Sequence, residues 1–274
     1  MIILVLVLLG LCFGSFTNAL VWRIHEQSRT KSKKAKQELS ITKGRSMCPD
    51  CRHTLNALDL IPVISWVTLK GRCRYCRKPI SWQYPLVELL TAGLFVFSYA
   101  FWPFGWQAMG IMQFAIWLVM LVGFMALAVY DLRWQLLPTR IILPLGWLAL
   151  AEVVVLTAWH KDGLVALGAA LGVLCLAGLF YAIYQVSDGT WIGGGDVRLA
   201  VVIGLLVGGP LKVVLVLFFA SLLGILASLP TLIYKKGVLK VRIAFGPFLI
   251  VATVIVYLFG TSLIVWYKRQ FLLL

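Results

Sequence analysis

Long apolar runs, most of them close to the length of a bilayer-spanning helix, recur along the whole 274-residue chain. Eight can be marked, at 1–22, 82–102, 108–130, 141–159, 163–186, 199–209, 211–234 and 243–267. A bilayer core requires about 20 residues of helix, and only helices or closed barrels satisfy their backbone polar groups in lipid. The chain is 61% hydrophobic and 13% charged, which excludes a soluble globule. We expect an all-α polytopic membrane protein with about eight transmembrane helices.

The shortest apolar run, 199–209, would cover only about 16 Å as a helix, and a run that short is often re-entrant. Loop charge favours counting it as a span. If all eight runs cross the membrane, 21 of the 25 Lys and Arg residues lie on one face. If 199–209 does not cross, the four basic residues of 235–242 move to the other face, which the positive-inside bias disfavours. The resulting topology has both termini outside.

The net charge of +15 is concentrated in one polar insert, since residues 23–80 hold 14 basic and four acidic residues. Such an excess is compatible with nucleic acid, but a basic stretch between spans is typical of cytoplasmic loops. We therefore expect contact with membrane lipid and no nucleic-acid partner.

The run 1–22 has neither a basic segment before it nor a small-residue cleavage site after it, which predicts a retained first span rather than a removed signal peptide.

Four of the six cysteines form two C-x-x-C pairs in this insert, separated by 21 residues: Cys48, Cys51, Cys73 and Cys76. Two such turns can place four thiolates around one tetrahedral, closed structural zinc ion. Two disulfides or a redox C-x-x-C are the alternatives, and a cytoplasmic position argues against stable disulfides. A small polar insert has little core of its own, so a metal would help it fold. Cys12 and Cys175 lie in apolar runs and are expected to be packing residues.

Two acidic residues adjoin apolar runs at what the topology makes the cytoplasmic face. Asp131 follows the run 108–130, and Asp196 follows three glycines, Gly193, Gly194 and Gly195. An Asp at membrane depth costs about 2.5–3.5 kcal/mol on insertion scales and is a functional candidate. The two can meet at that face, or each can simply solvate a helix end. Glu88 and Glu152 stand alone within spans.

The three glycines before Asp196 would let the backbone approach an extended substrate closely, although a glycine-rich turn can also be a mere connector. No phosphate-binding fingerprint accompanies them. If the two carboxylates share a site, repulsion makes the pair hold one proton. The ionised member can then take a proton from water while the protonated one polarises a carbonyl, which is aspartyl-type peptide hydrolysis. The rival hypothesis is a non-enzymatic membrane scaffold whose zinc knuckle docks a cytoplasmic partner.

Several motifs along the chain resemble those of one family, the type IV prepilin peptidases, which are membrane aspartyl proteases of the GxGD kind. They are Gly14-Ser15-Phe16-Thr17-Asn18, the two cysteine segments 45–51 and 71–76, Tyr84-Pro85-Leu86-Val87-Glu88, Asp131-Leu132 with Leu137-Pro138, and Gly193-Gly194-Gly195-Asp196-Val197-Arg198-Leu199. Two positions depart from the family pattern. Thr139 stands where the family often has Asp, and Arg198 stands where it often has Lys.

The resemblance implies an enzyme of the bacterial inner membrane that removes a short basic leader from prepilins or pseudopilins after a Gly, at the cytoplasmic face. Asp131 and Asp196 would be its catalytic dyad, with Gly193, Gly194 and Gly195 as a substrate-binding loop. Many members with the cysteine loop also methylate the new amino terminus with S-adenosylmethionine, so a peptidase with or without methyltransferase activity is expected. No nucleotide-binding fingerprint marks a methyl-donor site, for which Glu88 and the insert 23–80 are guesses and not named sites. The substrates would serve type IV pili or type II secretion.

These observations together predict three parts. Residues 1–22 form a first transmembrane helix, 23–81 a cytoplasmic zinc-binding insert, and 82–274 a membrane-embedded aspartyl peptidase domain.

Overall fold

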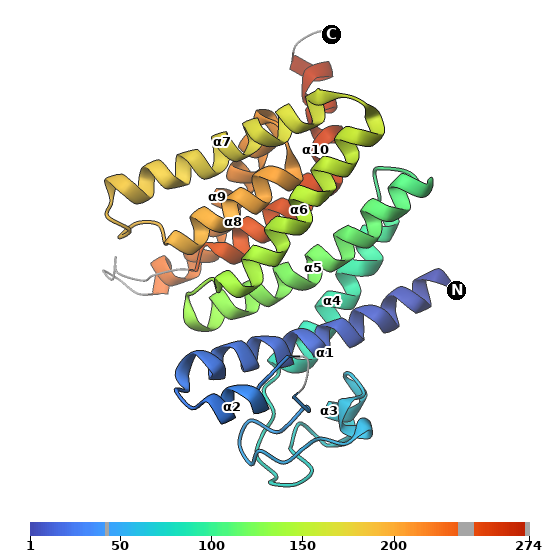
Figure 1. Ribbon diagram of the computed structural model, residues 1–274, viewed down its shortest axis with the longest axis vertical. Helices are drawn as coiled ribbons and strands as arrows, with labels where there is room; N and C mark the ends of the chain where they lie inside the picture. Colours follow the sequence, from blue (N-terminus) through green and yellow to red (C-terminus); the bar gives the residue numbers. More distant parts are fainter. Residues whose placement is uncertain (42–43, 235–243, 272–274) are drawn as a thin grey trace. The chain divides into compact units, whose positions relative to one another are not determined.

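The computed structural model describes residues 1–41, 44–234 and 244–271, and this part of the chain is helical without a β-strand (Figure 1). The elements are α1 (Ile2–Arg29), α2 (Lys33–Glu38), the 3-10 turn η1 (Ala57–Leu60), α3 (Ile64–Thr68), α4 (Gln83–Ala100), α5 (Ala108–Trp134), α6 (Thr139–His160), α7 (Gly163–Val186), α8 (Gly194–Val207), α9 (Pro210–Tyr234) and α10 (Gly246–Phe271). The predicted all-α class is therefore confirmed. The basic loop predicted at 235–242 lies outside the described residues.

Six of the described helices are long and apolar enough to cross a membrane: α1, α5, α6, α7, α9 and α10. Two further helices occupy predicted spans. Helix α4 has 18 residues and α8 has 14, which gives α8 a length of about 21 Å. As membrane spans, these two stay predictions, so six of the eight expected helices have the length and composition needed to cross a membrane.

Helix α1 continues seven residues past the end predicted for the first span, to Arg29. Its polar last turns organise the chain that follows. The buried Arg23 guanidinium donates hydrogen bonds to the carbonyl oxygens of Ser40, Ile41 and Gly44 at 2.8–3.3 Å. Hydropathy therefore marked where the apolar stretch ends and not where the helix ends.

The chain forms two compact units. The first contains Met1–Ala100 and Leu118–Ala126, and the second contains Phe101–Trp117 and Leu127–Leu274. In the first unit α1 packs along α4, and two glycines of α1 allow the backbones to approach. A Cβ atom on Gly14 would lie 2.5 Å from Glu88 Cα, and one on Gly10 would lie 2.4 Å from Ala92 Cα. This is the small-residue packing typical of membrane helices.

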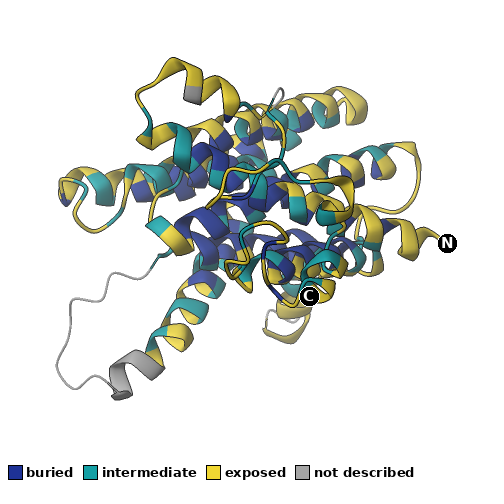
Figure 2. Ribbon diagram, turned by 90° about the horizontal axis from the view of Figure 1, so that it is seen from below, coloured by how far each residue is buried: buried dark blue, intermediate teal, exposed yellow. Residues whose placement is uncertain are grey.

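In the second unit α8 is enclosed by α6, α7 and α10, and α9 packs against α7 and α10. Leu199, Ala200, Val202 and Ile203 of α8 are at most 1% exposed. A short helix is acceptable at such a place because protein, rather than lipid, surrounds it. Figure 2 shows buried residues on the helix faces that pack against other helices and exposed residues on the opposite faces.

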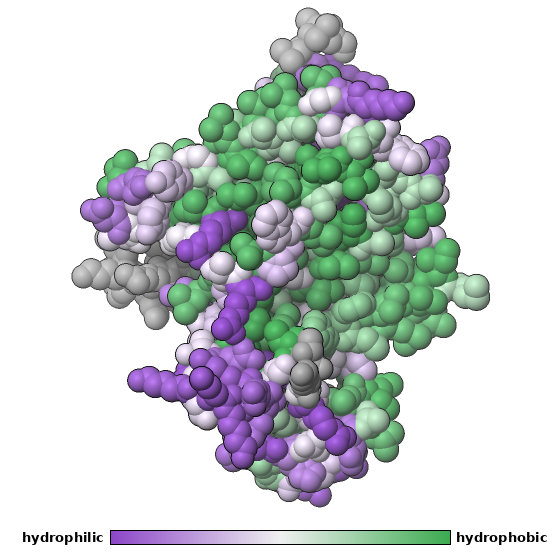
Figure 3. Space-filling model, in the orientation of Figure 1, coloured by the Kyte–Doolittle hydropathy of each residue, from purple (hydrophilic) through white to green (hydrophobic). Residues whose placement is uncertain are grey.

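On the face drawn in Figure 3 the helices are largely covered by hydrophobic side chains, whereas hydrophilic side chains gather over the insert between α1 and α4. Leu174 and Leu164 of α7 are 69% and 68% exposed, as expected for side chains that meet lipid. Cys12 and Cys175 are also exposed, which gives no support to their interpretation as small packing residues. An apolar run in a membrane protein does not distinguish the lipid-facing side of a helix from its protein-facing side.

We predict that Gly14→Ala destabilises the first unit by about 1–3 kcal/mol, because the added methyl group would overlap the backbone of α4 at Glu88. Thermal unfolding of the purified protein measures this effect. Gly93→Ala is the matched control, since a Cβ on Gly93 of α4 has no neighbour within 4 Å. Equal unfolding midpoints for the two variants would contradict the close contact.

Candidate active site and metal centre

Asp131 lies in the last turn of α5 and is 5% exposed. The helix ends at once, because Gln135 adopts a left-handed conformation with φ of 52° and its N–H bonds the Asp131 carbonyl. The Asp131 carboxylate accepts a hydrogen bond of 3.1 Å, Oδ2 to N, from the buried backbone N–H of Gly246. Gly246 is the first residue of α10. A side chain from α5 is thus held by the start of a helix 115 residues later in the chain.

Asp196 lies in the first turn of α8, with Gly193 as the residue that caps this helix. Its half-buried carboxylate turns back and accepts a hydrogen bond from the Gly193 N–H. The free N–H groups and the positive end of a helix favour a negative charge at this place. Asp131 has the opposite setting, since the last turn of a helix carries a partial negative charge.

The structure brings Asp131 and Asp196 together in the second unit, close enough for their charges to interact. Leu137, in the turn between α5 and α6, lies close to Gly195, which precedes Asp196, and to Gly246, which bonds Asp131. A Cβ on Gly195 would be 2.8 Å from Leu137 Cβ, and one on Gly246 would be 3.4 Å from Leu137 Cδ2. The α5–α6 turn, the start of α8 and the start of α10 therefore meet at one place.

The two positions that depart from the family pattern also meet there. The Arg198 guanidinium on α8 donates a hydrogen bond to the hydroxyl of Thr139, the first residue of α6. This bond ties the segment that carries Asp196 to the segment that follows Asp131. The Thr139 hydroxyl thus accepts the hydrogen bond that an acidic side chain at this position could also accept.

The three glycines before Asp196 differ in their surroundings. Gly193 is exposed, whereas Gly194 and Gly195 are half-buried. Gly195 is required by its close approach to Leu137, because a side chain there would collide. The role of the three as a substrate-binding loop stays a prediction.

Sequence reasoning missed Gly246. The chain has Phe245-Gly246-Pro247 at the start of the last apolar run, and Gly-Pro at the beginning of a helix is common enough to pass unnoticed. Its significance is spatial, because the Gly246 N–H reaches Asp131 and a Cβ would lie 2.6 Å from Asp131 Oδ2. Phe245 packs against Phe180 of α7, with ring centroids 6.2 Å apart.

The four cysteines of the insert form one cluster. The sulfur atoms of Cys48, Cys51, Cys73 and Cys76 all lie within 4.8 Å of one another. The sulfurs of Cys48 and Cys76 are 3.9 Å apart, against about 3.8 Å expected between sulfurs that share a tetrahedral zinc ion with bonds of about 2.3 Å. The cluster has the ligand number, chemistry and spacing of a closed metal site.

The two C-x-x-C segments adopt the same local structure. Cys48 and Cys73 each donate their N–H to the carbonyl five residues on, of His53 and Lys78. Each also accepts, through its carbonyl, the N–H four residues on. The residues that donate it, Arg52 and Arg77, have φ of 57° and 61°. The insert is thus built from two equivalent knuckles.

Backbone N–H groups also point at the sulfurs, from Asp50 and Cys51 toward Cys48, and from Tyr75 and Cys76 toward Cys73. Burial raises the pKa of the Cys48 thiol to about 12. Burial acts in the same direction on Cys73, but these N–H groups bring the pKa of that thiol below its ordinary value. N–H donors of this kind stabilise the thiolate that a metal requires.

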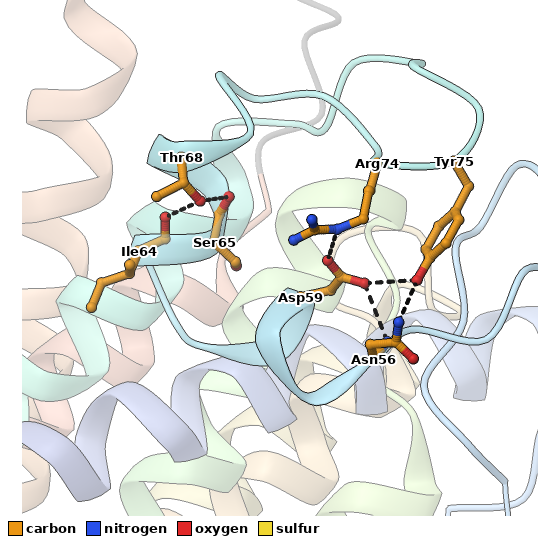
Figure 4. A network of polar contacts seen from close by, with 7 residues as sticks. All are labelled: Asn56, Asp59, Ile64, Ser65, Thr68, Arg74 and Tyr75. Carbon is orange, nitrogen blue, oxygen red and sulfur yellow. Dashed lines mark hydrogen bonds and ion pairs between the residues drawn. The ribbon is translucent and has the colours of Figure 1, made fainter.

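A polar network supports the second knuckle (Figure 4). The Arg74 guanidinium binds the Asp59 carboxylate at 2.7 Å, and the Tyr75 hydroxyl and the Asn56 N–H donate to the same carboxylate. Although burial acts to raise it, these donors lower the pKa of Asp59 below its ordinary range. The hydrogen bond and charge of Asp59 raise the pKa of Arg74 in turn. The carboxylate is 3% exposed, so the network fixes η1 against the knuckle.

The motifs 14–18 and 84–88 join the insert to its two helices. The Asn18 amide donates to the Tyr84 carbonyl at 3.1 Å and accepts from Gln83. The buried Glu88 carboxylate accepts hydrogen bonds from the Ser15 hydroxyl and, at 2.7 Å, from the N–H of Val63 in the insert. Val63 has φ of 60°, a conformation that a β-branched residue rarely adopts, so Glu88 anchors a strained turn.

Comparison with known proteins agrees with these motifs. Residues 8–102 match the model of the bacterial peptidase A24 N-terminal domain, and residues 118–229 match that of the type IV leader peptidase family. The chain is 32% identical over 279 residues to the prepilin leader peptidase/N-methyltransferase of Aeromonas salmonicida, an alignment that covers 97% of this chain and 93% of that protein. The chain belongs to the type IV leader peptidase family.

Other relatives in the type IV leader peptidase family are similar to a comparable degree. The protein of the same name from Aeromonas hydrophila is 36% identical over 228 residues, which cover 83% of this chain and 76% of that protein. The type 4 prepilin-like proteins leader peptide-processing enzyme of Escherichia coli O78:H11 is 34% identical over 250 residues, 87% of each chain. No solved structure matches the chain significantly. Gly246 lies outside both ranges matched by the family models.

Proposed function

We propose that this protein is an aspartyl endopeptidase that removes the basic leader from prepilins or pseudopilins at the cytoplasmic face of the bacterial inner membrane. Asp131 and Asp196 are its catalytic dyad, and a structural zinc ion holds the insert. The enzyme then methylates the new amino terminus with S-adenosylmethionine. The name of two of its relatives, prepilin leader peptidase/N-methyltransferase, supports both activities.

The observation that carries the proposal is the approach of two acidic side chains from distant segments. Asp131 ends α5 and Asp196 begins α8, yet their carboxylates interact in one unit, with Gly246 donating to the first. Two aspartates that merely solvate helix ends have no reason to share surroundings. The arrangement therefore favours a peptidase over the non-enzymatic scaffold.

Hydrolysis by this pair needs one proton between the two acids. The first turn of α8 favours Asp196 as the ionised member, which takes a proton from water as the water oxygen attacks the scissile carbonyl carbon. Asp131 donates its proton to the carbonyl oxygen. When the tetrahedral intermediate collapses, Asp196 gives the proton it took from water to the leaving amine and the peptide C–N bond breaks. Asp131 takes its proton back from the hydroxyl as the carbonyl re-forms, which restores the pair.

The metal proposed for the insert is zinc, because four thiolates from two equivalent knuckles are a typical tetrahedral zinc site. Four protein ligands leave no open coordination position, so the site would be structural. Cys48, Cys51, Cys73 and Cys76 would hold it, and its contribution is folding rather than chemistry. The insert carries most of the net charge, and the positive-inside bias supports its position in the cytoplasm. The dyad lies at the same face on the topology derived from loop charge.

For the dyad, we predict that Asp131→Asn and Asp196→Asn each reduce leader cleavage by a factor of about 10³ or more, because amides keep the shape but cannot exchange the proton. Incubation with a prepilin and labelled S-adenosylmethionine, analysed by intact mass, measures leader loss and methyl gain together. Asp188→Asn is the matched control, since this exposed acid lies in the same loop as Asp196. Normal leader removal by either dyad variant would refute the assignment.

For Gly246, we predict that Gly246→Ala lowers the cleavage rate about a hundredfold, because its methyl group would displace the Asp131 carboxylate. Gly224→Ala on α9 is the control, since the nearest neighbour of a Cβ there is 3.8 Å away. The same mass assay provides the rate. Cleavage at the wild-type rate would show that the start of α10 is not part of the site.

For the metal, we predict that the purified protein contains zinc and that Cys48→Ser combined with Cys73→Ser removes it, because each knuckle then lacks one ligand. Elemental analysis by mass spectrometry measures the metal content. Cys12→Ser combined with Cys175→Ser changes two exposed cysteines outside the cluster and should leave the content unchanged. Zinc that persists after the first pair of changes would exclude the four-cysteine site.

A further inference from the structure

Glu152 is a buried acid that the proposed mechanism does not use. It lies on α6 in the second unit and is 4% exposed. Thirteen residues separate it from Thr139 at the start of α6, which is about 20 Å along the helix. An ionisable side chain at such depth in a membrane protein is a functional candidate by default.

Glu152 joins three helices through directional contacts. The hydroxyl of Tyr257 on α10 donates to Glu152 Oε1 at 3.2 Å, in a buried hydrogen bond. The side chain of Gln113 on α5 lies close enough to interact with the same carboxylate. The ring of Tyr257 is in turn stacked on Trp117 of α5, with centroids 4.1 Å apart and planes 7° from parallel, so the hydroxyl is held in one direction.

Stability alone does not account for this cluster. Two buried side-chain polar atoms of the described residues have no hydrogen-bond partner, Glu152 Oε2 and Trp102 Nε1. Both belong to residues that adjoin Tyr257, since the Trp102 ring is 6.1 Å from that of Tyr257. A partly satisfied polar network in a core is generally less stable than an apolar filling of the same shape. The network instead fixes the positions of the helices along their axes, because a hydrogen bond weakens steeply when its donor and acceptor move apart.

The three helices that Glu152 contacts are three of the four that build the candidate site, the fourth being α8, which carries Asp196. Helix α5 carries Asp131, 18 residues after Gln113; α6 begins at Thr139; and α10 begins at Gly246. Apolar contacts between helices tolerate small axial shifts, whereas the contact between Gly246 and Asp131 does not. A shift of α10 by a fraction of a helical turn would break the 3.1 Å hydrogen bond.

We propose that Glu152 is a positioning residue for leader cleavage. With Tyr257 and Gln113 it sets the axial register of α10 against α5 and α6, and so places the Gly246 N–H at the Asp131 carboxylate. This inference rests on the proposed peptidase function.

The test compares variants by kcat, KM and thermal stability in one prepilin cleavage assay. Glu152→Leu removes the hydrogen bonds and keeps most of the volume. We expect its kcat to fall roughly ten- to a hundredfold with KM unchanged, while its unfolding midpoint stays equal or rises. Glu152→Gln keeps an acceptor for Tyr257 and should restore kcat. Tyr257→Phe removes one hydroxyl and should lower kcat without loss of stability.

Thr253→Val is the matched control on α10. Thr253 is fully buried one turn before Tyr257, but its hydroxyl bonds only the Leu249 carbonyl of its own helix. Wild-type kcat in Glu152→Leu, or a loss of activity that parallels a loss of stability, would overturn the positioning role. If Glu152→Leu does not fold, Tyr257→Phe decides by the same two measurements. Absence of cleavage by the wild-type protein would instead overturn the proposed function itself.

Discussion

Helices in lipid gain little from burying apolar side chains against one another, because the lipid is equally apolar. This chain therefore depends on close backbone contact and on a few directional polar bonds. Gly14 brings α1 against α4, and Gly204 brings α8 against α7, where a Cβ would lie 2.7 Å from Val173 Cα. Asn18 and Glu88 add hydrogen bonds in the first unit. Each contact of this kind forms at only one axial position of one helix against its neighbour. A site assembled from helix ends requires such fixed positions.

The candidate active site consists almost wholly of such ends. Asp131 lies where α5 stops, Asp196 and Gly246 lie where α8 and α10 start, and Leu137 fills the turn between α5 and α6. Helix starts offer free N–H groups, and both are used, one toward each carboxylate. The charge of the acids is thus balanced by backbone dipoles.

Sequence patterns predicted the helices well where apolar runs and helices coincide. The run 163–186 is α7 residue for residue, whereas α1 outlasts its run because polar residues continue a helix without lengthening a hydrophobic stretch. The cysteine spacing predicted the cluster because two C-x-x-C turns have few ways to share a ligand. The pairing of Asp131 with Asp196 was anticipated from topology and from resemblance.

Other contacts could not be predicted from the pattern of side chains in the sequence. Gly246 acts through a backbone N–H, which every residue except proline possesses. Glu152 stood out as a lone acid in an apolar run, but its partner Tyr257 lies 105 residues away, beyond any local periodicity. The hydrogen bond from Val63 to Glu88 depends on an unusual backbone conformation at Val63, which a Val in the sequence does not predict. Contacts between distant segments therefore had to come from the structure.

The shortness of α8 bears on how the chain enters the membrane. Insertion machinery recognises about 20 apolar residues, and α8 has 14, with Asp196 and Arg198 in its first turns. Such a segment is a poor independent insertion signal and is expected to enter the bilayer together with α7 and α9. Helix α10, which supplies the N–H for Asp131, is synthesised after α5 and α8. The acids would then acquire their surroundings only after α10 is inserted, so a nascent chain that lacks α10 would carry no proteolytic activity.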